Sequence, residues 1–111
     1  MGIAARRAFE KISDGTATLV FPAIAFAELG FAIRKLKLAV DLDTLVGVLQ
    51  ETERIEIVDM LVSMVMMLPG LRAIPEMHDR LITAEAISRD ATLITKDHVI
   101  VGSGLVRTVW D

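Results

Sequence analysis

Short β-branched segments alternate with longer helical patterns along the chain, and this alternation restricts the possible fold more than any other feature. The segments with a strand pattern are residues 16–21, 55–58, 91–95 and 105–110. The segments with helical spacing of apolar residues are residues 4–12, 23–37, 41–52, 59–68 and 78–89. Strands that are separated by helices predict a parallel sheet with helices on its faces, which is the α/β class.

The length of 111 residues predicts one domain that spans residues 1–111. Hydrophobic residues make up 53% of the chain and charged residues 24%. This is apolar for a soluble domain. Either the sheet is buried on both faces, or part of the surface is kept for a partner.

Composition also excludes several kinds of site. The chain has no cysteine, which rules out disulfides and thiolate metal sites and favours the reducing cytoplasm. A formal net charge of −3 argues against general polyanion binding, so any contact with nucleic acid needs a local basic patch or bound cations. No membrane span is expected, because the apolar stretch Thr16 to Ile33 is interrupted by Pro22 and Glu28.

Three acidic residues stand out by their positions. Glu28 is the only ionisable residue among the eleven from Ala23 to Ile33, where an apolar helix predicts burial. Asp79 lies at the start of a helix, and Asp97 follows a strand at the edge where parallel sheets bind ligands. Each also has a plain structural explanation: Glu28 on a solvent-facing stripe or paired with Arg34, Asp79 as a helix cap, and Asp97 as a turn residue.

Considered together, the three acids predict a metal site. In an α/β fold Glu28, Asp79 and Asp97 can converge, and like charges this close need a cation to be stable. A donor set of oxygen atoms without a His or Cys pattern suits Mg²⁺ or Mn²⁺ better than Zn²⁺. His78 and His98 flank two of the acids, but their spacing favours solvent-facing side chains over metal ligands.

Several segments carry a resemblance to a known family: residues 21–29, 74–86, 91–97 and 103–110. In their order and spacing, the chain resembles the PIN-domain family, especially the VapC-like toxin ribonucleases of toxin–antitoxin pairs. The resemblance implies a three-layer α/β/α fold with a mostly parallel central sheet flanked by helices. It also implies that Glu28, Asp79 and Asp97 are three of the family's four metal-binding acids, and that Thr95 is a hydroxyl residue beside the last of them.

The activity implied by the resemblance is hydrolysis of RNA phosphodiester bonds with Mg²⁺ or Mn²⁺. The implied partners are an antitoxin protein and a second copy of the chain in a homodimer. Arg34, Lys35 and Lys37 could steer RNA, although a solvated helix end explains them equally well.

The chain departs from the family pattern at its start. Family members begin with a strand that ends in Leu-Asp-Thr/Ser, which supplies the first acid and lies in the middle of the sheet. The sequence from Met1 matches the helix that follows, and Asp14 falls in a turn, so the first strand is expected to be missing. The loss of a central strand would expose backbone edges that favour pairing with another chain.

The first hypothesis is therefore a metal-dependent endoribonuclease that is the toxin of a type II toxin–antitoxin system. A second hypothesis is a catalytically inactive PIN-like interaction domain that dimerises or binds an antitoxin-type partner. A third, a phospho-accepting or nucleotide-binding α/β domain, is weaker because the chain lacks a glycine-rich phosphate loop.

Overall fold

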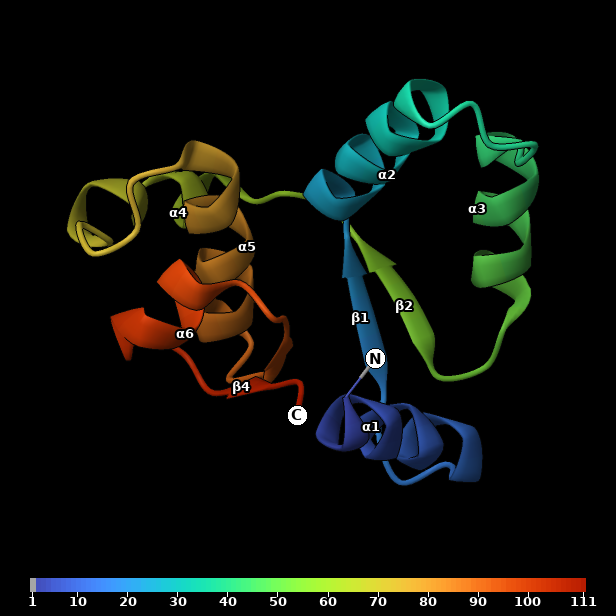
Figure 1. Ribbon diagram of the computed structural model, residues 1–111, viewed down its shortest axis with the longest axis horizontal. Helices are drawn as coiled ribbons and strands as arrows, with labels where there is room; N and C mark the ends of the chain where they lie inside the picture. Colours follow the sequence, from blue (N-terminus) through green and yellow to red (C-terminus); the bar gives the residue numbers. More distant parts are fainter. Residues whose placement is uncertain (1) are drawn as a thin grey trace.

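Helices and short parallel strands alternate in the computed structural model, which describes residues 2–111 (Figure 1). The strands are β1 (Leu19–Pro22), β2 (Ile55–Val58), β3 (Leu93–Ile94) and β4 (Thr108–Val109). The helices are α1 (Ile3–Asp14), α2 (Ala23–Lys35), α3 (Leu42–Glu51), α4 (Val62–Val65), α5 (Met77–Ser88) and α6 (His98–Ser103), together with the 3₁₀ helix η1 (Leu68–Gly70). The α/β class and the parallel strand direction predicted from the sequence are confirmed.

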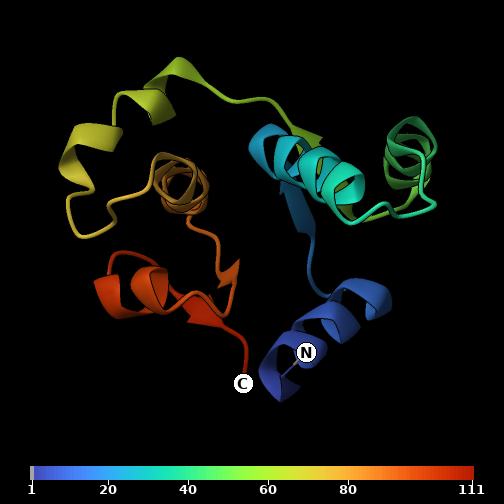
Figure 2. The ribbon, with the colours of Figure 1, turned by 45° about the horizontal axis from the view of Figure 1, so that its top comes forward.

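The strands described by the structure fall into two parallel pairs. In the first pair β1 lies against β2, with Leu19 opposite Ile55. In the second pair β3 lies against β4, with Leu93 opposite Thr108. Figure 2 shows one pair in each half of the molecule. In each pair one strand, β1 or β3, lies on the side toward the other half.

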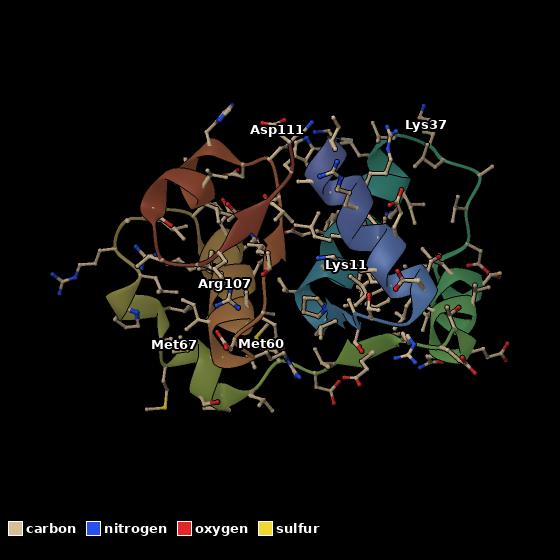
Figure 3. All side chains as sticks on the ribbon, turned by 90° about the horizontal axis from the view of Figure 1, so that it is seen from below. Lys11, Lys37, Met60, Met67, Arg107 and Asp111 are labelled. Atoms are coloured by element: carbon tan, nitrogen blue, oxygen red, sulfur yellow. The ribbon has the colours of Figure 1, made fainter. Side chains whose placement is uncertain are left out.

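The best-packed part of the molecule lies between α4 and α5. A buried cluster is formed by Met64 of α4, Leu71 at the end of η1 and Ala84 of α5. The residues that pack against it are Met67, Leu68 and Ile87. Figure 3 labels Met60, which precedes α4, and Met67, which follows it. The cluster fixes α5, the helix that carries Asp79.

The other half is more open than the sequence predicts. The apolar α2 has no fully buried residue, and Phe31 on it is 76% exposed. The prediction that α2 is largely buried was therefore wrong. The physical reason is that α2 contacts β1 and α5, which cover only part of its apolar surface.

Two segments differ from the predicted elements. The apolar run at residues 59–68 forms only α4 and the start of η1, because Pro69 has no N–H to continue an α-helix. Residues 98–103, which were not predicted to be helical, form α6, because the side chain of Asp97 accepts hydrogen bonds from the first N–H groups of that helix. None of the helices within residues 2–111 has the length and hydropathy needed to cross a membrane.

Candidate metal centre

Glu28 lies in the second turn of α2, directly after β1. The strand ends at Pro22, whose extended backbone serves as the N-cap of α2. Glu28 is exposed and forms no ion pair within residues 2–111, so the pairing with Arg34 considered above is not present. Partial burial still raises the pKa of its carboxyl group, and the nearby charge of Asp79 raises this pKa further.

Asp79 lies in the first turn of α5, and its backbone is held by Glu76. The N–H of Asp79 donates to Oε2 of Glu76, the N-cap residue, over 2.8 Å. Burial raises the pKa of the half-buried Asp79 carboxyl group, and the charge of Asp97 raises it next. The positive end of the helix dipole favours an anion at this position.

Asp97 follows β3 and is held at three points. Its Oδ1 accepts from the N–H groups of Val99 and Ile100, at 2.9 and 3.0 Å, and so caps α6. Its own N–H donates to Oγ1 of Thr95 over 3.1 Å. Thr95 thus fixes the backbone of Asp97, while the capping bonds engage Oδ1 and leave Oδ2 for other contacts.

Asp79 interacts electrostatically with each of the other two acids. The charge of Asp97 raises the pKa of Asp79, and the charge of Asp79 raises that of Glu28. The oxygen-only donor set fits Mg²⁺ or Mn²⁺. Within residues 2–111, however, no three His, Asp or Glu side chains are close enough together to hold a metal ion. A cation at this site would have to draw the carboxylates closer together.

Two further residues belong to this charged region and were not proposed from the sequence. Glu76 raises the pKa of both Glu28 and Asp79, and it accepts from Nδ1 of His78 over 2.7 Å. His78 lowers the pKa of both acids. The sequence feature that could have identified Glu76 is its position three residues before Asp79, because an N-cap side chain can accept from the third N–H of a helix.

Thr95 and His98 also border an open cavity of about 520 Å³. The cavity lies between the start of α1 and the residues after β4, which include Trp110. Lys96 places its Nζ 5.8 Å from the centre of the Trp110 ring. The cavity gives Thr95 access to solvent beside Asp97.

The fold and the positions of the acids can be compared with known proteins. Residues 2–101 match the family described as the PIN domain. A solved structure, VapBC2 from Rickettsia felis bound to a DNA fragment from their promoter, superimposes with a TM-score of 0.71 at 22% identity. The match covers 96% of this chain and 83% of that one, and at this identity it shows the fold alone. A comparison with curated proteins gave no match. Since the family match extends over most of the sequence, the chain belongs to the PIN-domain family.

Proposed function

We propose that this chain is a metal-dependent endoribonuclease and the toxin component of a toxin–antitoxin pair. PIN domains in general depend on divalent metal. The observation that carries the proposal is the position of Asp79 at the start of α5. There the charge of Asp97 raises the pKa of Asp79, and the charge of Asp79 raises the pKa of Glu28. Carboxylates that raise one another's pKa in this way gain most from a shared cation.

Glu28, Asp79 and Asp97 would hold Mg²⁺ or Mn²⁺ through their carboxylate oxygens. A divalent ion at this position supplies Lewis-acid polarisation of a phosphate oxygen and lowers the pKa of water. The residues of the chain provide the placement: Glu76 holds the backbone of Asp79, and Thr95 holds that of Asp97. The reaction adds water across one P–O bond of RNA and leaves two separate strand ends.

The proposed partners are an antitoxin protein and a second copy of the chain. The VapBC2 structure, which is similar in fold, is described as bound to promoter DNA. Apolar side chains around α4 are available for an interface, because Leu61, Val62 and Met66 are 51%, 75% and 76% exposed. The absence of cysteine fits a cytoplasmic location for such a pair.

Cleavage of RNA tests the proposal. The purified chain should cut a structured RNA in the presence of 1 mM Mn²⁺ and stop when EDTA is added. Asp79→Asn and Asp97→Asn should each reduce the rate roughly a hundredfold or more, since each loses a charge that holds the ion. The matched control is Asp43→Asn, because Asp43 is also a first-turn aspartate but lies on α3, away from the acids.

The alternative is an inactive interaction domain, which the lack of a gathered group of three acids within residues 2–111 favours. An inactive interaction domain should not cleave RNA in Mn²⁺, and its thermal stability should be the same with and without the ion. Metal-dependent cleavage that disappears in Asp79→Asn but not in Asp43→Asn would exclude it.

A further inference from the structure

The open cavity beside Asp97 has its walls in the C-terminal part of the chain. All of its lining residues except Ala4 come from residues 95–111. They belong to the turn after β3, to α6, and to β4 with the residues that follow it. Its volume of about 520 Å³ is within the range of sites for small organic ligands, about 300–1,000 Å³. The cavity therefore has room for a ligand of nucleotide size.

The indole ring of Trp110 gives the cavity a flat apolar wall. Trp110 is the single tryptophan of the chain, and it is half-buried. Its backbone is held in place, because its carbonyl accepts from the N–H of the buried Ala5 over 3.1 Å. Figure 3 shows the next residue, Asp111, beside the start of α1. An indole that is held in this way is a platform on which a planar ring can stack.

A cationic side chain lies over this ring. Nζ of Lys96 is 5.8 Å from the centre of the Trp110 ring. Cation–π contacts extend to about 6 Å, so this contact is weak and leaves the exposed ammonium group free to turn toward an anion. Proteins that bind single strands of nucleic acid combine an aromatic ring for the base with a cation for the phosphate. Trp110 and Lys96 therefore fit a nucleotide better than an uncharged ligand.

The cavity adjoins the turn that carries Asp97. Thr95 and Lys96 precede this acid, His98 follows it, and all three line the cavity. Thr95 is two residues from Asp97, which is at most roughly 7 Å along an extended chain. A nucleotide in the cavity would therefore be next to the nucleotide whose phosphate lies at the acids.

Helix α1 carries positive charge away from the cavity. Ala4 lines the cavity, and Arg7 and Lys11 follow it on the same stripe of the helix. Both basic side chains are exposed. Because the net charge of the chain is −3, RNA needs a local basic path of this kind, and the stripe supplies one for the phosphates beyond the cavity.

We propose that this cavity binds one base of single-stranded RNA, next to the nucleotide that is cleaved. The base stacks on Trp110, and Lys96 contacts the phosphate of the same nucleotide. The carboxylate of Asp111, which also lines the cavity, accepts from N–H groups on the edge of the base. This inference rests on the proposed function, because the acids define where the RNA is cut.

The fluorescence of Trp110 tests the proposal, since no other tryptophan contributes to it. The probe is an oligoadenosine hexamer in EDTA, so that no RNA is cut. Stacking of a base should quench Trp110. A hexamer with the same phosphates but without bases should not quench it, and should bind roughly tenfold more weakly, as expected from the loss of one stacked base.

Variants separate stacking from other contacts in anisotropy titrations with a fluorescein-labelled hexamer. Trp110→Leu should weaken binding roughly tenfold and Trp110→Phe much less, because a phenyl ring can still stack. Phe31→Leu is the matched control, because Phe31 is an exposed aromatic residue that does not line the cavity. Lys96→Ala should lower the slope of log Kd against log salt by about 0.7, the value for one phosphate contact. The comparison of the two hexamers on the wild type stands even if Trp110→Leu fails to fold.

Three results would overturn the proposal. These are equal affinity for the two hexamers, no binding of oligoadenosine at roughly 1 mM, and cleavage of RNA in Mn²⁺ without quenching of Trp110. Quenching by a hexaglutamate peptide but not by oligoadenosine would assign the cavity to an acidic protein segment instead. Quenching by oligoadenosine without any cleavage in Mn²⁺ would support the base site and refute only the proposed nuclease.

Discussion

Replacement of Arg80 by alanine tests how the start of α5, and Asp79 with it, is held in place. The guanidinium group of Arg80 donates through Nε to the carbonyl of Ile74, and through Nη1 to the carbonyl of Leu68 over 3.0 Å. These bonds tie the first turn of α5 to the loop that leads into it. No other side chain of residues 2–111 donates to either carbonyl.

The expected cost of Arg80→Ala follows from these two bonds. Hydrogen bonds from a charged donor contribute about 1.5–3 kcal/mol each. Ile74 is fully buried, so its carbonyl is hard for water to reach, whereas Leu68 is half-buried and water can replace much of the second bond. We therefore expect a loss of about 2–4 kcal/mol in the free energy of unfolding. For a domain of this size that lowers Tm by roughly 8–15 °C.

Urea denaturation followed by the fluorescence of Trp110, the single tryptophan, measures this loss. Arg72→Ala is the matched control, because Arg72 is an exposed arginine of the same loop. Arg80→Lys should fall between the wild type and Arg80→Ala, since an ammonium group cannot reach both carbonyls with the geometry of a guanidinium. If Arg80→Ala differs from Arg72→Ala by less than about 0.5 kcal/mol, the first turn of α5 is held by other contacts and the reasoning fails.

Three further predictions concern the acids and the core. The pKa values of Glu28 and Asp79 are raised in the folded state, which therefore keeps protons that the unfolded state loses, so in EDTA the free energy of unfolding should fall as the pH rises past 3.8 and 4.5. In urea titrations from pH 4 to 7, Asp79→Asn should flatten this fall, whereas an unchanged slope would argue against the electrostatic coupling of the acids. Backbone N–H donors lower the pKa of Glu76, so its cap stabilises α5 above pH 4.5 and weakens on acidification, and the difference in Tm between Glu76→Gln and wild type should shrink at lower pH. Met64→Ala should cost about 2–5 kcal/mol by calorimetry because Met64 is 2% exposed, and a cost below 1 kcal/mol would show that α4 does not pack on α5 as described.

Much of the fold could be predicted because local patterns are strong in this chain. The β-branched run Ile55–Val58 and the amphipathic spacing of residues 41–52 specify a strand and a helix without reference to the rest of the molecule. The lengths of β3 and β4 could not be predicted, since strand ends depend on which neighbours pair with them. The apolar pattern at residues 59–68 was misleading, because the apolar side chains of Met64 and Leu68 indicate burial but not whether one continuous helix provides it.

The candidate site was predictable residue by residue but not in its geometry. Three positions are conspicuous in the sequence: Glu28 interrupts an apolar helical segment, Asp97 follows a strand, and Asp79 lies at the start of a helix. The role of Asp97 as the cap of α6 and the hold of Glu76 on Asp79 depend on helix starts that sequence spacing specifies only to within a few residues. The prediction that Glu28 is buried was wrong because the burial of α2 depends on what lies beside β1, which the local pattern does not contain.

We propose that Glu28, Asp79 and Asp97 bind one divalent cation together. Diffraction from crystals of the chain grown with MnCl₂, collected at the manganese absorption edge, tests it most directly. One anomalous peak is expected about 2.0–2.6 Å from carboxylate oxygens of Asp79 and Asp97, with Glu28 as a direct or water-mediated ligand. A peak at another surface, or no peak at a manganese concentration that supports RNA cleavage, would contradict it.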